Sequence, residues 1–186
     1  MPIEKKWFVV FPALLVVGFL AGMGGTFLYV EYVDTPEESL EEATVETSIL
    51  EEINDVRREH DVAALQENET LSVLAREHAA DMAEREFVGH DNPDGDGPSD
   101  RVDASPMECE RVSENIAQTW WDEPIEASDG GSTRLTSNAE LAEWLVEEWL
   151  DSPQHRENLL ASQWSTTGVG VVVEDSQVFA VQKFCS

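Results

Sequence analysis

An apolar run near the start of the chain restricts its fold more than any other feature. Residues 7–30 contain no charged side chain, and Lys5 and Lys6 precede them. As a helix this run would measure roughly 36 Å, enough to cross a hydrocarbon core of ~30 Å with some tilt. Lysines favour the cytoplasmic side. The run therefore predicts a single-pass transmembrane anchor over residues 1–30, with the C-terminal domain outside the cell membrane.

A cleaved signal peptide is the alternative interpretation of the same run. The small residues from Ala21 to Gly25 resemble a processing site. The apolar region of a signal peptide usually covers only about 7–15 residues, however, so the length of this run favours the anchor.

The acidity of the chain restricts its partners. Its formal charge is −28 over 186 residues, and Lys183 is the only lysine after residue 6. Such a surface repels phosphate backbones and anionic lipid headgroups, which argues against nucleic acid as a partner. Abundant carboxylates with almost no lysine favour solubility in very high salt and predict a halophilic archaeon as the source. Residues 31–47 hold seven acids and no Lys or Arg, which predicts an acidic stalk.

Beyond the stalk, the spacing of apolar residues is first helical and then strand-like. Helical spacing and capping residues predict five helices: from Ser48, from Thr70, around 113–121, from Ser137 or Asn138 to Leu150, and from Pro153. Residues 168–173 and 178–181 are strand-like on either side of Asp175-Ser176, which predicts an antiparallel hairpin. Helices followed by a terminal hairpin predict an α+β layered domain over residues 48–186.

Cys109 and Cys185 are the two cysteines, and both belong to the part predicted to lie outside the cell. An oxidising compartment permits a disulfide between them. The bridge would close a loop of roughly 76 residues and stabilise the fold by about 4.5 kcal/mol in the entropy model. Two unpaired thiols are the alternative, because sequence alone does not place the two Cα atoms within bridging range.

The four histidines occupy different contexts. His60 ends the first predicted helix and is expected in solvent, whereas His78 lies on an inner helix stripe and is expected in the core. His90 follows a helix at the start of a loop, where site residues concentrate. His155 falls in the first turn of a helix, whose dipole disfavours a charged imidazole. A neutral imidazole is the form that metal binding or base catalysis requires.

Glu114 is the most informative carboxylate. Its neighbours Ile116 and Ala117 are apolar, so the segment is expected to turn partly inward. A buried carboxylate needs a partner or loses its charge, and a histidine or a metal would provide one.

A loop with regularly spaced acids has part of the pattern of a calcium site. Asn92-x-Asp94-x-Asp96-Gly97, followed by Asp100 and Asp103, fits much of a twelve-residue calcium loop. Two prolines lie within it, and its first and last positions depart from the pattern. An ordinary acidic loop is therefore the favoured interpretation.

Four sequence motifs occur in order along the chain. The first is Ile53–Arg57, and the second covers residues 79–90 and ends in Phe-Val-Gly-His. The third is Ser-Glu-Asn-Ile-Ala at 113–117, and the fourth is Trp149–Leu159, followed by Gly-Val-Gly at 168–170. Together they resemble the CAP superfamily (cysteine-rich secretory proteins, antigen 5 and pathogenesis-related 1 proteins; the SCP domain) in its compact prokaryotic form. The resemblance implies an α-β-α sandwich. The side chains that support the motif are Asn54, Arg57, Asn115, Ser152, Arg156 and Asn158.

The resemblance also implies a site. Family members often hold a cavity of two His and two Glu that can bind zinc or another divalent cation. By motif, these positions correspond to His90, His155 and Glu114. The second glutamate does not carry over, because Ser152 stands at its position; Glu148 or Asp151 is the candidate substitute. An empty polar cavity competes with the metal site.

Three functional hypotheses follow. The first is a membrane-anchored extracellular module that binds an unknown ligand or protein. The second is a metal-dependent hydrolase, in which the same cavity would activate a water. The third is a structural surface domain. No Ser or Cys lies in a recognisable nucleophile motif, so covalent catalysis has no local support.

Overall fold

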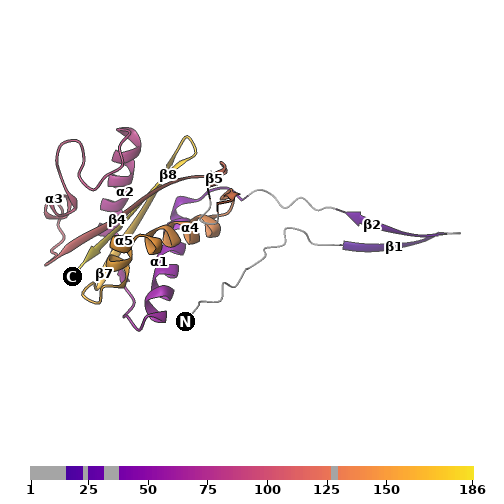
Figure 1. Ribbon diagram of the computed structural model, residues 1–186, viewed down its shortest axis with the longest axis horizontal. Coiled ribbons are helices and arrows are strands. Elements are labelled where there is room, and N and C mark those ends of the chain that lie inside the picture. Colours follow the sequence, from indigo (N-terminus) through magenta and orange to yellow (C-terminus); the bar gives the residue numbers. More distant parts are fainter. Residues whose placement is uncertain (1–15, 23–24, 32–37, 127–129) are drawn as a thin grey trace. The chain divides into compact units, whose positions relative to one another are not determined.

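The computed structural model describes residues 16–22, 25–31, 38–126 and 130–186 (Figure 1). The chain divides into two units, residues 1–37 and 38–186.

In the first unit, the described residues form a hairpin. Strand β1 (Val16–Gly22) pairs antiparallel with β2 (Gly25–Glu31), in a register that runs from Val16 opposite Glu31 to Gly22 opposite Gly25. Valine, phenylalanine, threonine and tyrosine in these segments favour extended backbone, and glycines stand where the pairing ends. The helix predicted over 7–30 is thus absent from the part of this run that is described, and the rest of it lies outside the described residues. Within the described ranges, no helix is both long and apolar enough to cross a membrane.

The second unit is built on a four-stranded sheet in the order β3-β7-β8-β4. The strands are β3 (Gln66–Glu67), β7 (Thr166–Glu174), β8 (Gln177–Cys185) and β4 (Val112–Trp120). Strand β3 runs parallel to β7, and the other neighbours pair antiparallel. Strand β4 therefore forms one edge of the sheet. A separate short pair joins β5 (Ile125–Glu126) to β6 (Ser132–Thr133).

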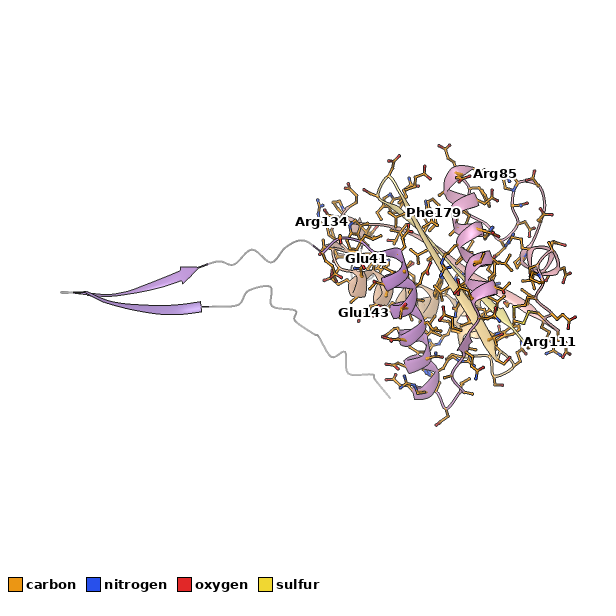
Figure 2. All side chains as sticks on the ribbon, turned by 180° about the vertical axis from the view of Figure 1, so that it is seen from behind. Glu41, Arg85, Arg111, Arg134, Glu143 and Phe179 are labelled. Carbon is orange, nitrogen blue, oxygen red and sulfur yellow. A yellow bond between two sulfur atoms is a disulfide. The ribbon has the colours of Figure 1, made fainter. Side chains whose placement is uncertain are left out.

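Helices cover both faces of the sheet. Helices α1 (Glu42–Glu59), α4 (Asn138–Asp151) and α5 (Pro153–Leu160) share a core with one face, while α2 (Glu69–Glu84) packs on the other, close to α3 (Pro98–Asp103). Strand β8 separates the two cores by alternation: Val178 and Ala180 join the larger one, and Phe179 packs against α2 (Figure 2). The predicted α-β-α sandwich is confirmed.

Two glycines let α2 lie directly on the backbone of β7. A Cβ added at Gly168 would stand 2.1 Å from the Ser72 nitrogen, and one at Gly170 would stand 2.2 Å from the Arg76 nitrogen. Real Cβ atoms do not approach backbone this closely. The Gly-Val-Gly block therefore sets the distance between helix and sheet.

Local signals predicted several elements correctly. The hairpin β7–β8 turns at Asp175 and Ser176, both with positive φ, and α4 begins behind the predicted cap Ser137, which forms a capping box with Glu140. The helix predicted over 113–121 is wrong, because this segment is strand β4.

The start of the domain also differs from the prediction. Helix α1 begins at Glu42, six residues before Ser48, so residues 42–47 belong to the domain and not to the stalk. The reason is the open edge of β7. The carboxylates of Glu42 and Glu46 accept hydrogen bonds from the backbone nitrogens of Val173 and Val171, at 2.8 and 3.0 Å. The acidic start of α1 thereby covers a strand edge that would otherwise remain unpaired.

A disulfide joins Cys109 to Cys185, with their Cα atoms 5.5 Å apart. It ties the loop before β4 to the end of β8. Both cysteines pack in a small cluster with Leu71 and Val102, between α2 and α3.

Candidate functional site

Glu114 is the centre of the candidate site. It lies near the start of β4 on the α2 side of the sheet, and only 4% of its surface is exposed. Its Oε2 accepts hydrogen bonds from Lys183 Nζ at 2.5 Å and from Arg101 at 3.0 Å. Its Oε1 accepts from His90 Nδ1 at 3.0 Å and from Arg101 at 3.2 Å. Both oxygens are therefore already occupied by cationic or imidazole donors.

These donors keep Glu114 ionised. Burial by itself raises the pKa of the carboxyl, but the hydrogen bond from His90 and the charges of Lys183 and Arg101 outweigh it and lower the pKa to about 2. A carboxylate with so low a pKa is a poor proton acceptor near neutral pH, so Glu114 is not suited to the role of general base.

Lys183 reaches Glu114 because of strand pairing. In the register of β4 with β8, Lys183 lies directly opposite Glu114, and its side chain is fully buried. Burial lowers the pKa of the Lys183 ammonium, while the adjacent carboxylate of Glu114 opposes that shift. Hydrogen bonding and Coulomb attraction across the pair favour the ionised form of both groups.

Arg101, on α3, connects Glu114 to the loop that carries His90. Its Nη2 also donates to the His90 carbonyl at 2.9 Å, and its Nη1 donates to the Asp96 carbonyl at 2.7 Å. Neither Arg101 nor Lys183 is among the site residues predicted from the sequence. A signal for Lys183 was present: it is the lone lysine of the domain and stands within an apolar strand.

The donation from Nδ1 of His90 to Glu114 leaves its Nε2 without a partner among the described residues, and 45% of this side chain is exposed. The ring of His155 likewise contacts no hydrogen-bonding group in the described ranges. Burial lowers the pKa of His155, and the neighbouring His90 lowers it further, so His155 is neutral near pH 7. Two imidazoles with free nitrogens thus lie close together at the edge of the sheet.

A network of polar side chains holds α5 against β4. Asn115, on the face opposite Glu114, donates to the His155 carbonyl at 3.2 Å and accepts from Asn158 at 2.9 Å. The Ser113 hydroxyl donates to Asn158 at 2.8 Å. Ser113 replaces the glycine expected from the resemblance, and this bond gives the serine a structural role. The backbone of His155 is therefore held at edge strand β4 through Asn115, the residue next to Glu114.

His78 is a core residue, as predicted. It is 1% exposed, and its Nε2 lies 2.9 Å from the Gly89 carbonyl and 3.8 Å from Glu114. Burial lowers its pKa, which keeps the ring neutral beside the ionic cluster. His60 ends α1 and is exposed, also as predicted.

The remaining motif residues are mainly structural. Arg57 is fully buried and donates to the carbonyls of Ala63, Leu159 and Ala161, which fixes the end of α1 to α5. Asn54 exchanges two hydrogen bonds with the backbone of Leu65. Ser152 stands at the N-cap of α5, although its side chain makes no capping bond, and Arg156 is exposed.

The residues present do not fit a divalent metal bound by Glu114. A cation at this carboxylate would have to displace Lys183 and Arg101, whose positive charges repel it. Glu148 lines a separate pocket with Gln118 and Thr119, further along β4. The two free imidazoles then fall short of the three protein ligands usual in a catalytic zinc site. Over the described part of the chain, no group of three His, Cys, Asp or Glu side chains is placed to hold a metal, and this includes the acidic loop 92–103.

The family model of the CAP domain (cysteine-rich secretory protein family) matches residues 50–184. The chain belongs to this family. The "Uncharacterized membrane protein YlbC" of Bacillus subtilis (strain 168) is 28% identical over 130 residues, which cover 70% of this chain and 32% of that protein. The chain thus spans about a third of the length of this relative.

Solved structures share the CAP fold. An extracellular SCP-domain protein from Bacillus anthracis superposes with a TM-score of 0.59 at 25% identity, covering 86% of this chain and 46% of that one. An outer surface protein from Borrelia burgdorferi gives a TM-score of 0.64 at 20% identity, covering 81% of this chain and 98% of that one.

Proposed function

We propose that this CAP domain is an extracellular binding module, anchored to the membrane by its N-terminal apolar segment and adapted to high salt. Its ligand or partner would meet the surface that His90 and His155 form beside β4. The main support for the proposal is that both carboxylate oxygens of Glu114 already accept hydrogen bonds within the protein, from Lys183, Arg101 and His90. The carboxylate orients His90 and leaves the two imidazoles as the groups free to contact a ligand.

The extracellular location is supported by the relatives and by the disulfide. The Bacillus anthracis protein is described as extracellular, and YlbC as a membrane protein. A disulfide such as Cys109–Cys185 persists in an oxidising compartment. The membrane anchor is supported by the run of 24 uncharged residues at positions 7–30.

The anchor can be tested in the full chain. Wild type and a Phe19→Arg/Leu20→Arg variant would be expressed and their membranes extracted with alkaline carbonate. We expect the wild type to stay in the membrane pellet and the variant to shift to the supernatant, because two charges at the centre of the run oppose insertion. Equal extraction of both proteins would contradict the anchor.

A metal-dependent hydrolase at the same site is the second candidate. It is favoured by the orientation of His90 through Glu114 and by the neutral state of His155, which leave two imidazole nitrogens able to bind zinc. Zinc, if bound, would supply a Lewis acid and an acidified water. The binding proposal instead predicts that the domain needs no metal.

Zinc titration distinguishes these candidates. The full chain in detergent and molar NaCl would be titrated with zinc by calorimetry, beside His90→Ala/His155→Ala and the exposed control His60→Ala. We expect no stoichiometric binding that depends on His90 and His155. Stoichiometric binding that is lost in the double variant and kept in His60→Ala would overturn the metal-free binding module and favour the hydrolase.

A further inference from the structure

A cavity lies at the other end of β4 from Glu114. It has a volume of about 640 Å³, is open to solvent, and is lined by the end of β4, strand β5, one side of α4 and the turn between β7 and β8. The cavity is independent of the His90 and His155 surface, because none of the ionic partners of Glu114 lines it.

Two tryptophans provide aromatic surface in this cavity. Trp120, the last residue of β4, is 40% exposed, although large apolar side chains are normally buried. Trp144 comes from α4 and is half-buried. Tryptophans from two different elements thus line the cavity.

Thr119, the residue before Trp120 in β4, contributes an unpartnered polar group. Thr119 is 3% exposed, lines the cavity, and points to the α4 side of the sheet, as Asn115 and Ala117 do. Its hydroxyl makes no hydrogen bond with any residue that the structure describes. An unpaired hydroxyl on a residue that lines a cavity is available to a ligand atom there.

The charge of the cavity has one sign. No Lys or Arg is among the described residues that line it. Four carboxylates line it, and none forms an ion pair with a described residue: Glu123, Glu126, Glu148 and Asp175. The nearby Arg134, labelled in Figure 2, is held by Asp122, at 2.5 Å from its carbonyl and 3.4 Å from its carboxylate. The negative potential of the cavity is therefore not neutralised internally.

We propose that this cavity binds a small organic cation through its ammonium group. Tryptophan is the strongest aromatic partner of a cation, and an ammonium in contact with an indole ring gains from cation–π attraction. The carboxylates add Coulomb attraction, and the Thr119 hydroxyl can accept a hydrogen bond from a primary ammonium. Acidic groups alone would not select such a ligand, because exposed carboxylates cover the rest of this surface; the tryptophans and the buried hydroxyl distinguish this place.

Calorimetric titration of the full chain in detergent and molar NaCl would test the proposal with three probes. Choline carries a quaternary ammonium, the capped amino acid N-acetyl-lysine methylamide carries a primary one, and 3,3-dimethyl-1-butanol is the uncharged isostere of choline. Saturable binding of either cation, without binding of the isostere, is expected. Tighter choline binding would indicate a free quaternary amine as the source of the cation, and tighter lysine binding would indicate the side chain of a protein partner.

Variants locate the binding. Trp120→Leu is expected to weaken the preferred cation about fivefold, and Glu148→Gln about threefold, while the unfolding temperature stays unchanged because both side chains are exposed. Glu59→Gln, an exposed acid at the end of α1, is the matched control and should bind as the wild type does. Equal weakening by Glu148→Gln and Glu59→Gln, or equal binding of choline and its isostere, would overturn the proposal, as would the absence of binding by both cations.

Discussion

Replacing Lys183 by methionine tests whether the ionic cluster holds the sheet together. The substitution keeps the length and apolar stem of the side chain but removes the ammonium that lies 2.5 Å from Glu114. The side chains of both partners are at most 1% exposed. Removing one partner of a buried ion pair destabilises a protein by about 3–5 kcal/mol, since the other charge is left with too few partners. We expect an unfolding temperature lower by about 6–20 °C, at roughly 2–4 °C per kcal/mol for a chain of this size.

The control for this experiment is an exposed ion pair. Arg85 pairs with Asp94 at 2.7 Å, and 70% of the Asp94 side chain is exposed. Arg85→Met should therefore change stability little. Both variants and the wild type would be unfolded thermally in molar salt, which screens surface pairs far more than buried ones. A loss below about 1 kcal/mol in Lys183→Met, equal to that in the control, would refute the reasoning.

The same cluster predicts a dependence on pH. The pKa of Glu114 is about 2 in the folded chain, below the ordinary value of 4.5. A lowered carboxyl pKa stabilises the fold above pH 4.5, and this contribution is lost as pH falls toward 2. The shift corresponds to about 3 kcal/mol. In acid titrations followed by circular dichroism, the stability gap between wild type and Glu114→Gln should shrink by about this amount between pH 5 and 2. A constant gap would contradict the assignment.

Three further substitutions test the scaffold by thermal unfolding. Gly170→Ala places a Cβ 2.2 Å from the Arg76 nitrogen and should destabilise by at least about 1–3 kcal/mol, whereas Ala at half-buried Gly89, with no contact below 3.7 Å, should change little. Cys185→Ser opens a loop of 76 residues and should remove about 4.5 kcal/mol, a loss that reduction of the wild type should reproduce. Ser137→Ala removes the α4 cap and should reduce stability by about 1 kcal/mol; a loss below about 0.3 kcal/mol would argue against the capping box.

The elements that sequence predicted correctly are those with local signals. Ser137 with Glu140, Ser152 with Pro153, and the turn at Asp175-Ser176 each specify an element boundary within a few residues. Strand β4 has no such signal, because its pairing partner β8 begins more than fifty residues later. Its inward and outward alternation was therefore mistaken for a short helix.

The candidate site shows the same limit. Glu114 contacts His90, and His90 in turn lowers the pKa of His155. The partners Lys183 and Arg101 come from the last strand and from a short helix, and only the register of β8 against β4 places Lys183 opposite Glu114. The residues that decide whether Glu114 is free to bind a metal were therefore beyond the reach of local patterns.

The few Lys and Arg side chains distinguish two kinds of carboxylate in this chain: buried ones that are paired with a cation, and cavity-lining ones that are not. Against 39 acids the chain has 11 Lys and Arg, and within the described ranges two acids are buried, Glu46 and Glu114. Arg76 binds Glu46, and Lys183 with Arg101 binds Glu114. Burial requires such pairing, so these cations are held by the fold and are not available to a ligand. Glu148 lines a cavity and has no cationic partner there among the described residues. We therefore expect a cationic ligand to compensate its charge.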